Sequence, residues 1–254
     1  MTAARLAAIW RHPIKAHGRE ELTGVRLTEG AALPWDRHWA VAHDAARIDR
    51  LHPAWAACTN FSRGAKAPRL MALTAQLDEA AGQIALSHPD LPPLTFRPGD
   101  TAGERAFLDW VRPLCPADRA QPAGLYAVPG GALTDTDYPS VSLLNLASNA
   151  DLAARMGLDL SPLRWRANLW LDGPAPWAER NWVGRRLSLG EAELEIVEPI
   201  VRCAATTANP GTGRVDADTL GALRALHGEQ VFGLYARVTR GGTVRRGDPV
   251  EVLS

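Results

Sequence analysis

Short apolar runs dominate the chain, and turn residues separate almost all of them. Runs of this kind, bounded by turn chemistry, indicate strands and not a regular alternation of strands and long helices. The segments TEG at 28–30, AGQ at 81–83 and HPDLPP at 88–93 are typical separators. We therefore predict a β-rich α+β fold, with strands at 5–10, 25–28, 38–42, 69–77, 83–87, 140–144, 167–171, 185–189, 193–199, 231–238 and 243–253.

Three stretches have apolar spacing and end signals typical of helices, and they fall at 101–114, 148–157 and 216–228. Thr101 and Glu104 have the spacing of a capping box, in which each side chain pairs with the other's backbone N–H. Ser148 and Asp216 are the expected first residues of the other two helices. Gly157 and Gly228 are their expected ends.

A segment rich in Pro, Gly and Ala at 113–124 follows the first helix. Such composition marks a change of direction or a boundary between units. We expect one domain at 1–120 and a second at 121–254, with the first strands open to being shared between them.

The overall charge and the cysteines limit the function classes. Lys and Arg total 28, as do Asp and Glu, so no broad basic field attracts nucleic acid or an anionic membrane. Cys58, Cys115 and Cys203 are widely spaced and form no CxxC pair, which favours a reducing compartment. No run approaches the roughly 20 apolar residues of a membrane span, and the first 15 residues do not look like a secretion signal. We expect a cytoplasmic protein that binds neither nucleic acid nor membrane.

Few residues have a context that suggests chemistry. Lys15 and Lys66 are the only lysines in an arginine-rich chain, so Lys15 is a candidate for a compact charge at a tight anion site. Cys203 follows Arg202 at the end of a strand-like run, and a nearby cation favours the thiolate form that ligates metals or carries sulfur. A chance surface lysine and a buried structural thiol are the competing interpretations. The histidines lack zinc-site spacing, and neither a GxSxG elbow nor a complete P-loop is present.

The order of these residues resembles a known family, the MOSC-domain proteins. HPIKAHG at 12–18 is similar to the Tyr-Pro-(Val/Ile)-Lys-Ser opening of the MOSC N-terminal barrel, and PWDRHWAV at 34–41 is similar to its Asp-Arg-aromatic-Trp strand. WRAN at 165–168 resembles Phe-Arg-Pro-Asn. RCAATTANPGTG at 202–213 resembles Arg-Cys-x-x-Thr-Thr-x-Asp-Pro-x-Thr-Gly, and FGLYARVTRGGTVRRGDPVEVL at 232–253 resembles the closing strands.

The resemblance covers almost the whole chain, and its nearest groups are the C-terminal domains of molybdenum-cofactor sulfurases and the amidoxime-reducing component proteins. It implies a small N-terminal β-barrel-like region followed by a MOSC β-barrel with a few short helices. It also implies the molybdenum cofactor, molybdenum bound to molybdopterin, with Cys203 as both metal ligand and catalytic residue. The implied cofactor-binding residues are Lys15, Arg37, Arg166, Asn168, Ser140, Thr206 and Thr207.

Cations and directional donors suit a dianionic phosphate, and a soft thiolate suits a metal that changes oxidation state. The resemblance further implies that the loop at 60–66 faces the substrate side, which makes Arg63 and Lys66 candidates for the cleft. The chain departs from the family pattern at four positions, Ala16 for Ser, Ala167 for Pro, Val201 for a small polar residue and Asn209 for Asp.

Three functions follow from these observations as alternatives. The first is an oxidoreductase that reduces small N-hydroxylated compounds, such as hydroxylamines or amidoximes. Because no ferredoxin-like segment is expected in this chain, its electrons would come from a separate ferredoxin- or flavin-reductase-type protein. The second is a sulfur carrier or transferase that delivers sulfur to the molybdenum cofactor or to other metal–sulfur acceptors through a Cys203 persulfide. The third is a cofactor carrier without turnover.

Overall fold

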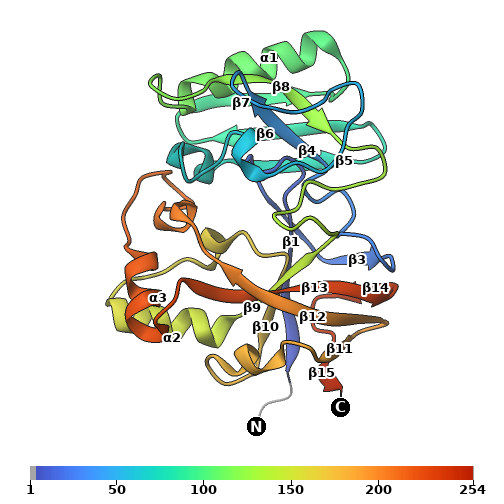
Figure 1. The fold of residues 1–254 in the computed structure, drawn as a ribbon, viewed down its shortest axis with the longest axis vertical. Coiled ribbons are helices and arrows are strands. Elements are labelled where there is room, and N and C mark those ends of the chain that lie inside the picture. The colour runs from blue at the N-terminus through green and yellow to red at the C-terminus, as the bar shows by residue number, and fades with distance from the viewer. Residues whose placement is uncertain (1–3, 254) are drawn as a thin grey trace.

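An eight-stranded sheet forms the lower lobe of the computed structural model, which describes residues 4–253 (Figure 1). Its neighbouring strands pair antiparallel except for the fifth and sixth in the order below, β9 and β10, which are parallel. In order across the sheet, the strands are β15 (Val250–Leu253), β11 (Arg186–Leu189), β12 (Ala192–Val201), β13 (Val231–Arg240), β9 (Val141–Asn145), β10 (Leu169–Asp172), β1 (Arg5–Arg11) and β2 (Glu20–Leu22).

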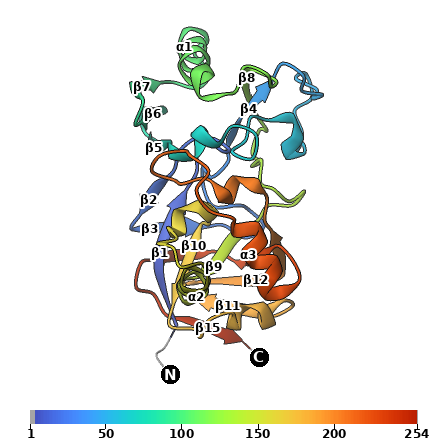
Figure 2. The ribbon, with the colours of Figure 1, turned by 90° about the vertical axis from the view of Figure 1, so that its left-hand side faces the viewer.

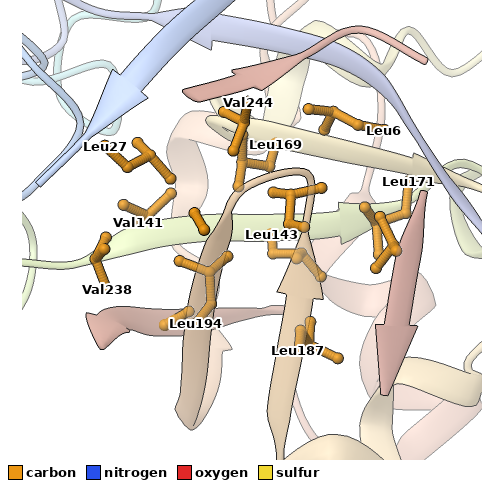
Figure 3. Close-up of a cluster of buried hydrophobic side chains, with 14 of the residues drawn as sticks. Leu6, Leu27, Val141, Leu143, Leu169, Leu171, Leu187, Leu194, Val238 and Val244 are labelled. Carbon is orange, nitrogen blue, oxygen red and sulfur yellow. The ribbon is translucent and has the colours of Figure 1, made fainter. Parts of the chain in front are cut away.

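One face of this sheet curls around an aliphatic core, whose side chains converge in Figure 3. Along β12, Leu194 and Ile196 are buried while Glu195 is exposed, which is the two-residue period of a strand with one face inward. A separate antiparallel pair, β3 (Gly24–Leu27) and β14 (Gly242–Arg245), adds Leu27 and Val244 to the same core.

The predicted MOSC barrel is not a closed ring of paired strands. Within residues 4–253 the sheet order begins at β15 and ends at β2, and these two edges do not pair with each other. Backbone hydrogen bonds instead join the start of β1 to the segment that leads into β15, from Leu6 N to the Asp248 carbonyl at 2.9 Å and from Gly247 N to the Leu6 carbonyl at 2.8 Å. The pair β3–β14 covers a further part of the core.

Two helices cover the other face of the sheet, α2 (Leu146–Met156) and α3 (Thr219–His227) (Figure 2). Between helices and sheet lie Trp165, Trp170 and Phe232. Every residue of β9 is therefore buried, because a strand covered on both faces loses the alternation seen in β12.

The upper lobe holds two small sheets and one helix, which is labelled α1 in Figure 1. Residues from the helix and both sheets share a second apolar core that includes Phe107 and Val41. The edge strand β7 contains Pro92 and Pro93, which an edge tolerates because fewer ladder bonds are needed there. The elements are β4 (Trp39–His43), β5 (Thr74–Asp78), β6 (Gln83–His88), β7 (Leu91–Phe96), α1 (Thr101–Val111) and β8 (Pro122–Ala127).

The chain passes from one lobe to the other and back. β1 and β2 lie in the lower sheet, whereas β8, which follows the expected boundary at residue 120, pairs with β4 of the upper lobe. The domain limits 1–120 and 121–254 stay a prediction. No helix within residues 4–253 has both the length and the apolar character needed to cross a bilayer.

The predicted first residues of the helices were wrong by one to three positions. The N-caps are Asp100 in place of Thr101, Asn145 in place of Ser148 and Asp218 in place of Asp216, each with a side-chain oxygen that accepts a backbone N–H. Gly157 and Gly228 end α2 and α3 as predicted, both with left-handed φ. The predicted strand at 69–77 was wrong in its first half, where Pro68–Ala72 forms a 3-10 helix that buries Leu70, Met71 and Ala72.

Candidate functional site

A cavity of about 470 Å³ lies where the two lobes meet. The loop at 58–71 lines it from the upper lobe, and Lys15, Ala16 and Arg37 line it from the segments that join the lobes. The lower lobe contributes Arg164–Arg166, the end of β12 with the residues after it, and Tyr235 of β13. Among the described residues of its wall, six carry a positive charge (Lys15, Arg37, Arg63, Arg164, Arg166 and Arg202) and three a negative charge (Asp135, Asp137 and Glu198).

Cys203 lies on the wall of this cavity and is exposed. β12 ends at Val201, and Cys203 is the extended residue that precedes the short 3-10 helix Ala204–Thr207. The hydroxyl of Thr206 donates to the carbonyl oxygen of Cys203 at 3.1 Å and contacts the Thr219 hydroxyl at 2.7 Å. Thr206 thus holds the backbone that presents the thiol.

Arg202 is buried, and its guanidinium bonds to the core beneath the site. Its Nε donates to the Phe232 carbonyl at 2.7 Å and its Nη1 to the Trp165 carbonyl at 2.9 Å. The guanidinium also lies over the rings of the same two residues, 5.5 Å from Trp165 and 5.9 Å from Phe232. Arg202, the cation next to Cys203 in the sequence, therefore also fastens the end of β12 to the core.

Lys15 is buried, and its ammonium lies within one loop. Nζ donates to the carbonyl oxygens of Leu133 at 2.7 Å and Thr134 at 3.1 Å, and pairs with Asp135 Oδ1 at 2.6 Å. Lys15 therefore lines the cavity, but the carboxylate of Asp135 already lies beside it.

Arg37 and Arg166 form a connected pair of cations. Arg37 is ion-paired with the buried carboxylate of Asp36, and its Nη2 donates to the Arg166 carbonyl at 3.0 Å. Arg166 Nη2 donates to the Gly18 carbonyl at 3.0 Å. Burial, together with the charges of Arg37 and Arg19, lowers the pKa of Arg166 to about 9.

Three guanidinium nitrogens on this wall are buried and have no hydrogen-bond partner within residues 4–253. They are Arg164 Nε, Arg166 Nη1 and Arg202 Nη2. A buried charged donor without a partner is costly, and an anionic ligand would relieve that cost. The wall therefore fits a phosphorylated ligand.

Three cavity residues have the left-handed backbone that side chains disfavour. Their φ angles are 62° at Ala16, 50° at Arg37 and 50° at Arg166. Such a conformation costs roughly 1–2 kcal/mol for a residue with a Cβ, and it persists where the surrounding structure imposes it. The sequence offers no sign of this feature, since none of the three is glycine or asparagine.

Ala16→Gly should raise the free energy of unfolding by about 0.5–1 kcal/mol, because glycine adopts φ near 62° without the Cβ clash. Urea unfolding measures the change. Ala65→Gly is the matched control, since Ala65 lines the same cavity and is not among the residues with left-handed φ. Ala65→Gly should lower stability, and an equal loss in Ala16→Gly would contradict the strain argument.

Four predicted residues lie away from the cavity wall. Asn168 is buried, and its Oδ1 accepts from the Ser142 hydroxyl at 2.8 Å while its Nδ2 donates to the Trp10 carbonyl at 3.1 Å. The Ser140 hydroxyl accepts from Thr136, and Thr207 donates to the Ala204 carbonyl. Lys66 lines a neighbouring cavity of about 240 Å³, whereas Arg63 lines both cavities.

The structure adds wall residues that the sequence did not single out, among them Asp135, Arg164, Tyr235 and Cys58. Cys58 accepts a hydrogen bond from Arg63 Nη1 at 3.2 Å. Burial raises the pKa of Tyr235 above its usual range, with a further contribution from Asp135. Arg164 and Tyr235 come from separate elements of the chain, so only the tertiary fold could have shown that they line the same cavity.

The fold and site define a two-lobed, β-rich protein with an exposed thiol on the wall of a cation-rich cavity. The family model for the MOSC N-terminal beta barrel domain matches residues 3–110, and that for the MOSC domain matches residues 132–251. The chain therefore belongs to the MOSC-domain family, and it carries both domains.

Similar proteins include mitochondrial amidoxime-reducing component 1 of Mus musculus, which is 33% identical over 130 residues, 46% of this chain and 38% of the mouse protein. Molybdenum cofactor sulfurase of Caenorhabditis briggsae is 34% identical over 99 residues, 37% of this chain and 14% of that protein. The matches thus span well under half of these relatives. A crystal structure of the YUAD protein from Bacillus subtilis aligns over 99% of this chain and 96% of that one, at 13% identity and a TM-score of 0.46.

Proposed function

We propose that the chain binds the molybdenum cofactor in the 470 Å³ cavity and reduces small N-hydroxylated compounds. The observation that carries the proposal is the presence of an exposed thiol, Cys203, and the unsatisfied donor of Arg166 on one cavity wall. Thiolate sulfur suits a redox metal, and fixed guanidinium groups suit a phosphate. The amidoxime-reducing relatives supply the substrate class.

The residues would divide the work by chemistry. Arg166, Arg37 and Lys15 would hold the phosphate, and Cys203 would ligate the metal. When bound, the molybdenum would supply the change of oxidation state that reduction of an N–O bond requires. Glu198 and Tyr235 line the same cavity, and either could exchange a proton with a substrate there. Electrons would come from a separate ferredoxin- or flavin-reductase-type partner, and the proposed location is the cytoplasm.

Metal analysis and pterin fluorescence test the proposal on protein purified from cells that make the cofactor. Wild-type protein should hold about one molybdenum and one pterin per chain. Cys203→Ala should lose the metal and keep the pterin, because the thiolate ligates molybdenum while the cations hold the phosphate. Cys115→Ala is the control and should keep both, since Cys115 does not line this cavity. Wild-type protein with neither molybdenum nor pterin would contradict the proposal.

The exposure of Cys203 also favours the second function, sulfur carriage. A persulfide donor would transfer one sulfur atom to the thiolate and release its own thiol. Mass spectrometry of the chain after incubation with such a donor would show an added sulfur atom on Cys203 and none on Cys115. An unmodified Cys203 would exclude this function and leave the reductase proposal in place.

A further inference from the structure

The loop between β8 and β9 wraps the ammonium of Lys15 with three consecutive residues. The carbonyl oxygens of Leu133 and Thr134 and the carboxylate of Asp135 take its three hydrogens, at 2.7, 3.1 and 2.6 Å. A lysine has only three donors. As the protein stands, Lys15 therefore has no hydrogen left for a ligand.

Of the three acceptors, Asp135 is the one that can leave. The backbone that supplies the other two acceptors is held in place, because Leu133 N donates to the Arg37 carbonyl at 2.8 Å and Trp55 Nε1 donates to the Thr134 carbonyl at 3.0 Å. The Asp135 side chain, by contrast, is 48% exposed, although its partner Lys15 is buried. The carboxylate can rotate into solvent without moving the loop.

Asp135 also faces the other cations of the site. Desolvation opposes ionisation, but the charges of Lys15, Arg37 and Arg166 together hold the pKa of Asp135 below its usual range. The carboxylate lies on the wall of the cavity at the point where these three charges converge. A ligand phosphate at this position would gain the attraction of all three cations.

We propose that Asp135 is an internal counter-anion that occupies the Lys15 position and must be displaced by the phosphate of an incoming ligand. Asp135 is then the residue that sets how tightly the site binds phosphate. A tethered carboxylate competes at a high effective concentration, so only a ligand with a stronger charge or further contacts displaces it. The inference rests on the proposed function for the identity of the phosphorylated ligand, but its test requires only inorganic anions.

The test compares Asp135→Asn with Asp137→Asn, using the full chain purified from cells that do not make the cofactor. Asp137 is on the same loop and the same cavity wall, and it has no ion pair within the described residues. Isothermal titration with inorganic phosphate and with pyrophosphate measures affinity. Asp135→Asn should bind about tenfold more tightly than wild type, the effect of about one paired charge. Asp137→Asn should stay within about twofold, which separates displacement from a general change of charge.

Two further variants keep the result interpretable. Asp135→Glu retains the charge and should retain wild-type affinity. Lys15→Met combined with Asp135→Asn should lose the gain, because the freed ammonium is what binds the anion. Phosphate binding in Asp135→Asn that is equal to or weaker than wild type, with circular dichroism showing a folded protein, would overturn the inference.

Two preparations separate this inference from the proposed function. If Asp135→Asn binds phosphate more tightly in the cofactor-free preparation, while wild-type protein from cells that make the cofactor holds no pterin, the counter-anion is supported and the cofactor is rejected. A chain that acquires pterin equally well with and without Asp135, and binds phosphate equally well, would reject the counter-anion alone.

Discussion

Lowering the pH from 7 to 4 is expected to remove several kcal/mol from the free energy of unfolding. His12 and His17 are both buried, at 1% and 0% exposure. Burial lowers the pKa of His12 to about 3, with a further contribution from the charge of Arg166. Burial likewise lowers the pKa of His17 to about 4. Both rings are therefore neutral in the folded protein at pH 5, whereas in the unfolded chain they are mostly protonated.

The sign follows from proton binding. Below pH 6.5 the unfolded state binds more protons than the folded state, so stability falls as the pH falls. The contribution of these two neutral rings to stability is fully present above pH 6.5. It is lost as the pH falls to about 4 for His17 and to about 3 for His12. Each ring contributes on the order of 3 kcal/mol by pH 4, at about 1.4 kcal/mol per pH unit. Asp36, whose pKa lies below its usual range because of Arg37 and His12 in spite of desolvation, adds a further loss below about pH 4.

Urea unfolding at pH 7, 6, 5 and 4 measures this loss. His17→Gln should reduce the pH dependence of stability by about half, because glutamine does not bind a proton in this range. Glutamine can still donate to the Lys15 carbonyl that His17 Nδ1 contacts at 2.7 Å, so the fold should be retained. His52→Gln is the control, since its ring is 85% exposed and should leave the curve unchanged. An identical slope in wild type and His17→Gln would show that His17 is not the source.

Arg202→Ala is expected to lower the free energy of unfolding by about 3 kcal/mol. Hydrogen bonds from a charged donor contribute about 1.5–3 kcal/mol, and two carbonyl oxygens, of Phe232 and Trp165, would lose theirs. The contacts with the two aromatic rings would be lost as well. The variant no longer buries a cation, and this gain offsets part of the loss. That burying the Arg202 cation is unfavourable is shown by its pKa, which desolvation lowers to about 10.

Arg237→Ala provides the matched control for Arg202→Ala. The Arg237 guanidinium lies 4.3 Å from the centre of the Tyr138 ring at an exposed position, so its loss should cost less than about 1 kcal/mol. Chemical denaturation of the two variants and wild type gives both values. Equal, small losses would mean that Arg202 does not fasten β12 to the core.

Local sequence chemistry predicted much of the fold. Leu194, Glu195 and Ile196 alternate in the chain as they alternate in β12, and Gly157 and Gly228 end helices where expected. The errors came where tertiary burial overrode local pattern. Leu70 and Met71 look like strand residues, yet the 3-10 helix at Pro68–Ala72 buries Leu70 in the core of the upper lobe and Met71 beside the cavity.

The site was predicted in part for a similar reason. Lys15, Arg37, Arg166 and Cys203 stood out by type and by family resemblance, and they line one cavity. The position of Asn168 is set instead by contacts with Ser142 and Trp10, which are far away in the sequence. Asp135 showed no local signal at all.

The amino-acid sequence by itself determined the β-rich class, the C-terminal ends of α2 and α3, the family and the residue types able to bind an anion and a soft metal. Each of these depends on neighbours within a few positions of the chain, or on motifs that retain their order. Only the tertiary structure decided that Arg202 is buried against the core while Cys203 is exposed, and that Asp135 pairs with Lys15. Those outcomes depend on burial and charge between segments at least 30 positions apart, which no local pattern encodes.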